Sequence, residues 1–121
     1  ANFHDSELYG NYADAGGGGI SNNGSAAFYN GLIEANEVGV FSKGGGILQT
    51  AGSFSLWGTS IKRNKADKGG AAYVIAGPLA LNSCTVASNT APTLGAGLCY
   101  KTGAPVPTEA GGVSQGIVLD P

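Results

Sequence analysis

Residues 56–72 read LWGTSIKRNKADKGGAA, and the pattern in this stretch recurs three more times along the chain. Each copy contains an asparagine, with a branched aliphatic residue three positions before it and a large apolar residue eight positions before it. The asparagines are Asn11, Asn36, Asn64 and Asn89. The two apolar sets are Leu8, Ile33, Ile61 and Val86, and Phe3, Phe28, Leu56 and Leu81. A pattern that recurs at intervals of 25, 28 and 25 residues predicts a solenoid of about four coils.

A glycine-rich element follows each asparagine, at residues 17–20, 44–47, 69–72 and 95–98. Glycine costs roughly 1 kcal/mol against alanine in a helix, which argues against helical repeats. Leucine-rich repeats share the period but need several leucines at fixed spacing, and these are missing. The local period is two, as in Phe54 and Leu56. We therefore predict an all-β fold, a single-stranded parallel β-helix over residues 1–100.

The aligned positions also predict how the coils hold together. Residues at equal offset stack about 4.8 Å apart in a parallel β-helix, so the two apolar columns are expected to fill the lumen. The column Asn11–Asn36–Asn64–Asn89 is expected to form a ladder, because each side-chain amide can bond to the copy above it. Asparagine also tolerates a left-handed backbone, so we expect it to occupy a sharp corner.

Composition argues against several classes of partner. The net charge of −2, with 12% charged residues, gives no reason to expect nucleic acid or an anionic membrane as a partner. Polar residues interrupt the uncharged stretch between Lys68 and Lys101, so we expect no membrane insertion. The chain lacks a CxxC motif and the Cys and His residues of a zinc site, so no metal or other cofactor is expected.

Cys84 and Cys99 are the two cysteines of the chain, and both belong to the last repeat. Two cysteines are too few to define a redox compartment. They form either a disulfide that braces one coil or two buried free thiols, and the sequence leaves both arrangements open.

The repeat pattern is lost from Lys101 onward. Residues 101–121 are expected to form an extended, Pro- and Gly-rich C-terminal tail that serves as a linker or as a cap over the last coil. Residues 104–108 read APVPT, which is typical of polyproline-like chain. Residues 116–119 read GIVL and can form one strand that pairs elsewhere.

The carboxylates are candidates for catalysis, because parallel β-helices include polysaccharide lyases and hydrolases that cluster carboxylates on adjacent coils. Asp14 and Asp67 share one offset but lie two coils apart, at about 10 Å. This separation is too loose for a metal pair, and no cleft is indicated, so we predict that the chain is not an enzyme. The other charges predict stacked opposite pairs on a solvated face, Glu34 with Lys62 and Glu37 with Lys65.

One offset places aromatic residues on the outer surface. His4, Tyr29, Trp57 and Asn82 each lie next to an inward residue and are expected to face outward. The aromatic strip, defined as His4, Tyr29 and Trp57, can stack against sugar rings. Alternatively, its members simply stack on one another on the face of a sheet.

Two triplets match N-glycosylation acceptor sequences. Asn23-Gly24-Ser25 has the standard form, and Asn82-Ser83-Cys84 has the weaker cysteine form. Asn23 is the better candidate on a eukaryotic secretory route, because we expect it in a turn between coils.

The paired motifs resemble a known family of repeats. LYGN (8–11), IEAN (33–36), IKRN (61–64) and VASN (86–89), each followed by glycines, are similar to repeats of the polymorphic outer membrane proteins of chlamydiae and of related bacterial and algal surface proteins. The resemblance covers about residues 3–100. It implies a right-handed β-helix, an extracellular or cell-surface location, and a passenger, adhesin or fibre role.

The ends of a four-coil stack present unpaired backbone and apolar lumen, and residues 1–2 leave no room for an N-terminal cap. We expect the ends to meet further coils of a longer chain, or another copy stacked head to tail in a filament. The leading hypothesis is therefore a non-catalytic structural module of an extracellular fibre or cell-surface appendage. The alternative is an adhesin-like module that binds glycans or a host surface through the aromatic strip. A third hypothesis is a remnant of a polysaccharide-active enzyme.

Overall fold

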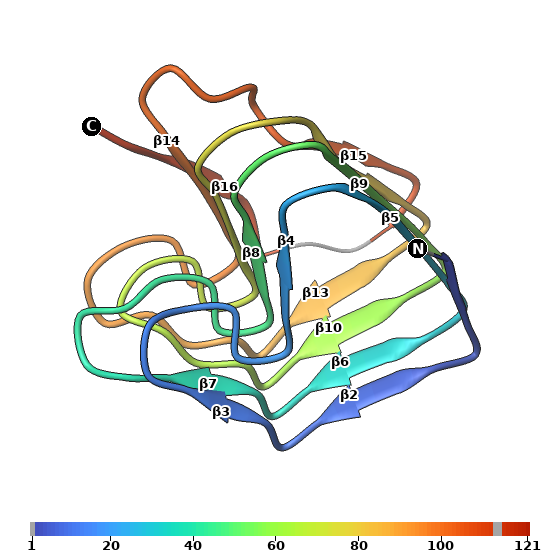
Figure 1. The fold of residues 1–121 in the computed structure, drawn as a ribbon, viewed down its shortest axis with the longest axis horizontal. Coiled ribbons are helices and arrows are strands. Elements are labelled where there is room, and N and C mark those ends of the chain that lie inside the picture. Colours follow the sequence, from blue (N-terminus) through green and yellow to red (C-terminus); the bar gives the residue numbers. More distant parts are fainter. Residues whose placement is uncertain (1, 113–114) are drawn as a thin grey trace.

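The computed structural model describes residues 2–112 and 115–121, which wind into a parallel β-solenoid of about four turns (Figure 1). The first sheet contains, in order, β1 (Asn2–His4), β5 (Ser25–Tyr29), β9 (Ser53–Trp57), β12 (Leu79–Asn82) and β15 (Thr108–Ala110). The second contains β2 (Glu7–Tyr9), β6 (Leu32–Glu34), β10 (Ser60–Lys62) and β13 (Thr85–Ala87). The third contains β4 (Ile20–Asn22), β8 (Ile47–Gln49), β11 (Ala72–Val74), β14 (Leu98–Lys101) and β16 (Ile117–Asp120). A short pair, β3 (Tyr12–Ala13) and β7 (Glu37–Val38), extends the coils on one side.

Residues that share an offset in the sequence repeat are partners in the sheets. The described strands all pair in parallel. In the second sheet, the column in register is Leu8, Ile33, Ile61 and Val86. In the first sheet it is Phe3, Phe28, Leu56 and Leu81. The middle members of both columns are fully buried, and burial of each side chain contributes about 1.5–3 kcal/mol to the stability of the fold. The predicted all-β parallel solenoid with apolar columns in its lumen is therefore confirmed.

The sharp corner lies one residue before each asparagine. Left-handed φ values occur at Gly10 (66°), Ala35 (57°), Arg63 (54°) and Ser88 (57°). The expectation that the asparagine itself occupies the corner is therefore wrong. The preceding residue turns the chain, which leaves the asparagine side chain aligned with its copies on the neighbouring coils.

Ala35→Gly is expected to stabilise the protein. A left-handed φ costs an L-residue roughly 1–2 kcal/mol, whereas the extra backbone entropy of glycine costs roughly 0.5–1 kcal/mol. The net gain in the free energy of unfolding should reach about 1 kcal/mol, measurable by urea denaturation. In the control, Ala27→Gly in strand β5 should lower the free energy of unfolding, because φ is not left-handed at Ala27. Equal losses in the two variants would contradict the corner assignment.

The chain after Lys101 adds a further pass to the solenoid. Strand β15 pairs with β12, and β16 pairs with β14. Ala104 and Ile117 pack against the core. The extended tail predicted for residues 101–121 is corrected accordingly, because strand pairing continues beyond residue 100 as far as Asp120. The strand expected at residues 116–119 corresponds to β16.

Candidate functional site

The asparagine ladder expected from the sequence is present, and the fully buried Asn64 shows its geometry. The backbone N–H and Nδ2 of Asn64 both donate to Oδ1 of Asn89, at 2.9 Å and 3.0 Å. Nδ2 also donates to the carbonyl oxygen of Ile33 at 2.9 Å. Oδ1 of Asn64 accepts from the backbone N–H and Nδ2 of Asn36, both at 3.0 Å. The buried amide is therefore satisfied entirely by the neighbouring coils, which fixes their register.

The two ends of the ladder differ. At the start, the exposed Asn11 donates to Oδ1 of Asn36 from its backbone N–H and Nδ2, at 3.0 Å and 2.9 Å. At the far end, Asn89 donates in the same way to Oε1 of Gln115, at 2.8 Å and 2.7 Å. Nε2 of Gln115 returns a bond to the carbonyl oxygen of Asn89 at 3.1 Å. Gln115 was not predicted as a ladder residue, although its spacing of 26 residues from Asn89 fits the repeat.

The aromatic strip forms a stack on the outer face of the first sheet. The ring centroids of His4 and Tyr29 lie 4.6 Å apart, and those of Tyr29 and Trp57 lie 4.9 Å apart, with interplanar angles of 7° and 5°. Asn82 continues this column in register with Trp57. Stacking covers both faces of Tyr29 and one face of each outer ring, whereas sugar binding needs an open ring face. The strip therefore stabilises the first sheet, and glycan binding to it stays a prediction.

The salt bridge of Glu34 involves a different partner from the one expected. Nε of Arg63 lies 2.7 Å from Oε2 of Glu34, whereas Lys62 is only aligned with Glu34 in the sheet register. Arg63 occupies the left-handed corner, which brings its guanidinium to the carboxylate. The Arg63 side chain is more than half exposed, so the pair contributes only about 0.2–1 kcal/mol. Glu37 and Lys65 are aligned as expected, through an isolated β-bridge.

Asp14 and Asp67 each engage other groups. The Thr93 hydroxyl donates a short hydrogen bond to the Asp67 carboxylate. The Ser42 hydroxyl donates to the backbone carbonyl of Asp14 at 2.8 Å. Within residues 2–112 and 115–121, no three His, Cys, Asp or Glu side chains are grouped so that they could hold a metal ion.

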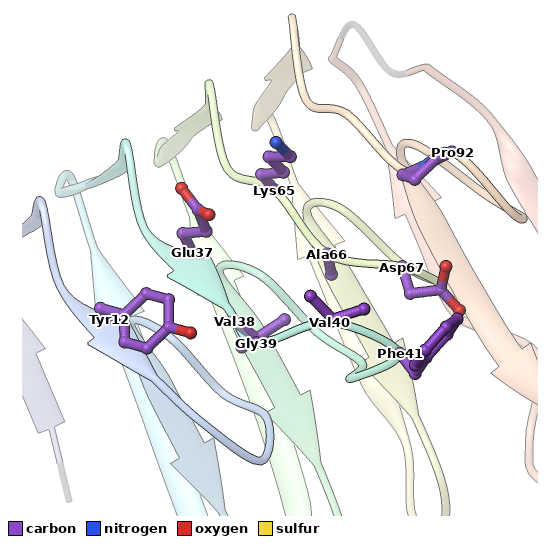
Figure 2. Close-up of a pocket in the computed structure, with 10 residues that line it drawn as sticks. All are labelled: Tyr12, Glu37, Val38, Gly39, Val40, Phe41, Lys65, Ala66, Asp67 and Pro92. Carbon is purple, nitrogen blue, oxygen red and sulfur yellow. The ribbon is translucent and has the colours of Figure 1, made fainter.

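A groove of about 190 Å³ lies on the outer surface beside β3 and β7 (Figure 2). Its lining contains Tyr12, Glu37, Val38, Gly39, Val40, Phe41, Lys65, Ala66, Asp67 and Pro92. Val40 and Phe41 form an exposed apolar lip, with 83% and 82% of their surface accessible. The groove thus combines apolar surface with charges of both signs and could hold a small amphipathic group. The groove includes Asp67, one of the two aspartates tested for catalysis from the sequence, together with the aligned charges Glu37 and Lys65.

Cys84 and Cys99 are both free and buried, so the disulfide considered for them is absent. Cys84 belongs to the core cluster and donates to the carbonyl oxygen of Asn82 at 3.4 Å. Cys99 instead shares a column of the third sheet with Tyr73. Because successive residues of a strand face opposite sides, and Leu98 of β14 faces the lumen, the Cys99 side chain faces away from it. Burial raises the pKa of the Cys99 thiol to about 11.

The two glycosylation candidates lie in different surroundings. Asn23 is exposed in the turn between β4 and β5. Asn82 is half-buried inside β12, between Trp57 and Ala110 in the sheet register. The turn leaves Asn23 more accessible to a modifying enzyme, and glycosylation of either residue stays a prediction.

Strand β16 is held to the third sheet by a cluster around Asp120, the C-terminal clasp. Oδ2 of Asp120 accepts a hydrogen bond of 2.5 Å from the buried Tyr73 hydroxyl, and Oδ1 lies 3.0 Å from Nζ of Lys68. Nζ of Lys43 lies 5.0 Å from the centre of the Tyr73 ring. The Tyr73 hydroxyl and the Lys68 ammonium lower the pKa of Asp120, while burial raises the pKa of Tyr73. This cluster was not predicted from the sequence.

Asp120→Ala is expected to loosen β16 and to speed alkylation of the buried Cys99. The substitution leaves the buried Tyr73 hydroxyl without an acceptor, which costs about 1–3 kcal/mol.

In the unmodified chain the same opening of β16 should appear in acid. Because folding lowers the pKa of Asp120, the stabilisation is complete above the unfolded pKa and is lost as the pH falls through the folded value. Lys101→Ala at an exposed position is the control. Equal Cys99 alkylation rates in the unmodified chain, Asp120→Ala and Lys101→Ala would show that Asp120 does not hold β16 in place.

The two ends of the solenoid present different surfaces. The first-coil face consists of the outer edges of β1, β2, β3 and β4 with Phe3, Leu8, Asn11 and Ile20. Its three large apolar residues are half-buried, because only one side of each is covered by another coil. The last-coil face consists of the outer edges of β13, β15 and β16 with Glu109, Gln115, Ile117 and Leu119. Leu119 is 44% exposed there.

Comparison with protein-family models, with curated proteins and with solved structures gives no match. The β-solenoid architecture therefore rests on the order and parallel pairing of the strands. The part of the chain that the structure describes contains no helix long and apolar enough to cross a membrane.

Proposed function

We propose that the chain is a non-catalytic structural module of an extracellular fibre or cell-surface appendage, which extends by end-to-end stacking of β-coils. The observation that carries this proposal is the first-coil face. Four strand edges, three half-buried apolar residues and the start of the asparagine ladder come together at one end of the solenoid. Strand edges and apolar columns of this kind favour association with another strand-bearing surface, which is either further coils of a longer chain or a second copy.

The last-coil face supplies the matching surface on a second copy. If the register of the third sheet continues by one step, Ile117 of one copy meets Ile20 of the next. Along the ladder, Gln115 meets Asn11 in the same way. Such a contact joins different surfaces of the two copies and does not close, so it generates a filament.

The extracellular or cell-surface location follows from the resemblance to the repeats of the polymorphic outer membrane proteins. The right-handed sense of the solenoid has the same basis. Both are part of the proposal, together with the fibre role that the resemblance implies.

Ile20→Lys is the variant that tests this function. It places a charge on the first-coil face opposite the apolar Ile117 of the next copy, and Ile20 is only half-buried, so the chain should still fold. We expect sedimentation and negative-stain images to show linear assemblies of the unmodified chain in acidic solution, and only monomers of Ile20→Lys. Val40→Lys, at a residue that is 83% exposed on the loop of the second coil, is the control. Assemblies that persist in Ile20→Lys would rule out stacking through this face.

The purified unmodified chain also distinguishes the adhesin alternative from the structural proposal. A chain that stays monomeric under all conditions and binds a glycan array, with binding lost in Trp57→Ala, would replace the structural proposal. The stacked aromatic rings give no specific support to this outcome, since their faces are largely occupied.

A further inference from the structure

One residue interrupts the match between the two end faces. Thr108, Glu109 and Ala110 of β15 continue the registers of the first sheet, and Glu109 is aligned with Leu81. It therefore follows Phe3, Phe28, Leu56 and Leu81 in the apolar column. A carboxylate thus stands where each preceding coil has a large apolar side chain.

Glu109 lies close to the end of the lumen. It is exposed to solvent on the last-coil face, so its charge is hydrated in the single chain. Burial is the main cause of the raised pKa of the core thiol Cys84, and the charge of Glu109 adds a smaller increase. The carboxylate is therefore near enough to the core to affect it electrostatically.

A second copy stacked in register would place its Phe3 against Glu109. The charged carboxylate would then lose its water without gaining a partner of opposite charge in the column, and burial of such a group is unfavourable. A protonated or neutral side chain avoids most of this cost. The remaining columns, such as Ile20 with Ile117, favour the contact.

We propose that Glu109 gates head-to-tail stacking of a second copy of this chain, keeping copies apart while it is charged and permitting assembly once it is neutral. This inference rests on the proposed function, and it adds a regulation by acid to that function. Within this column only the last-coil face carries the charge, because Phe3 on the first-coil face is uncharged.

Other titratable groups surround the same contact. On the last-coil face, Asp120 is paired with Lys68 and Tyr73, and Lys101 lies beside it in the register. On the first-coil face, His4, Asp5 and Glu7 are exposed. Asp5 and Glu7 add negative charge to the contact, so they disfavour stacking in the same direction as the charged Glu109. Weakening of the clasp at Asp120 acts in the opposite direction, which is why a pH-independent variant is needed.

Glu109→Gln supplies that variant, because it removes the charge at every pH. We expect it to assemble in neutral solution with a dissociation constant at least about tenfold lower than that of the unmodified chain. The unmodified chain should approach the same behaviour only in acidic solution, where carboxylates take up protons. Sedimentation velocity measures both. Glu37→Gln, which removes an exposed carboxylate on the side of the second coil, is the control and should behave like the unmodified chain.

The outcomes separate the gate from the proposed function. If the unmodified chain and Glu109→Gln assemble equally well in neutral solution, the gate is wrong and stacking stands. If neither these chains nor Glu109→Leu assembles at any pH, although circular dichroism shows them folded, then both the gate and the stacking function are wrong. Assembly of Glu109→Gln in neutral solution, with the control monomeric, supports both.

Discussion

Asn64→Asp is expected to lower the free energy of unfolding by about 3–5 kcal/mol at neutral pH, because it buries a charge without a partner. The new carboxylate oxygen would replace Nδ2, which lies 2.9 Å from the carbonyl oxygen of Ile33 and 3.0 Å from Oδ1 of Asn89. Two donated bonds would become two contacts between acceptors. The size and shape of the side chain barely change, so the loss measures the ladder itself. Urea denaturation at neutral pH gives the value.

The loss in Asn64→Asp should shrink in acid. A protonated carboxyl group can again donate one hydrogen bond, and the folded state would bind this proton more tightly than the unfolded state, so the deficit falls as the pH drops toward 4. Asn11→Asp is the matched control at the exposed end of the same ladder. It should cost less than about 1 kcal/mol, since water can solvate the new charge. Similar losses at the two positions would contradict a ladder that depends on burial.

Gly45→Ala is expected to cost about 3 kcal/mol or more, at the upper end of the range for overpacked sites. A Cβ at Gly45 would lie 2.5 Å from the carbonyl oxygen of Gly70 and 2.6 Å from that of Lys65. Both are backbone atoms of the next coil, so no side chain can move aside. The coils would have to separate, which would weaken the hydrogen bond of 3.1 Å from the Gly45 N–H to the Gly69 carbonyl.

Gly24→Ala is the control for this substitution. A Cβ at Gly24 meets nothing within 4 Å, and its φ is not left-handed. Alanine there should leave the urea midpoint unchanged or raise it slightly, because it reduces the entropy of the unfolded chain. A comparable loss in both variants would show that glycine is needed for flexibility rather than for close approach of the coils.

The repeated parts of the structure were predictable because each prediction rests on several copies. Ile33 and Ile61 share an offset in the sequence and a position in the sheet, since the same local geometry recurs in every coil. The asparagine ladder follows for the same reason, since a column of identical amides can bond along the stack. Periodicity therefore specifies the fold and the lumen.

The parts that occur once were not predictable in this way. Gln115 occupies the ladder position with a different amide, so a search for asparagine passes over it. The clasp joins Tyr73 to Asp120, which are 47 residues apart and belong to no repeated pair. Arg63 reaches Glu34 from a corner whose left-handed backbone is not visible in its residue type. These contacts depend on where individual side chains reach, which the sequence pattern does not encode.

Stacking of copies in register is the central claim, and intermolecular disulfide formation tests it most directly. Asn2 and Thr108 lie in one outward column of the first sheet, at opposite ends of the solenoid. In a head-to-tail stack they become neighbours about 4.8 Å apart, within the range that a disulfide spans. Mixing an Asn2→Cys chain with a Thr108→Cys chain, both in the Glu109→Gln background in neutral solution, should give mainly the mixed disulfide dimer, and the unmodified background should give less of it. Disulfides that form only within each variant, or none in a background that assembles, would contradict head-to-tail stacking.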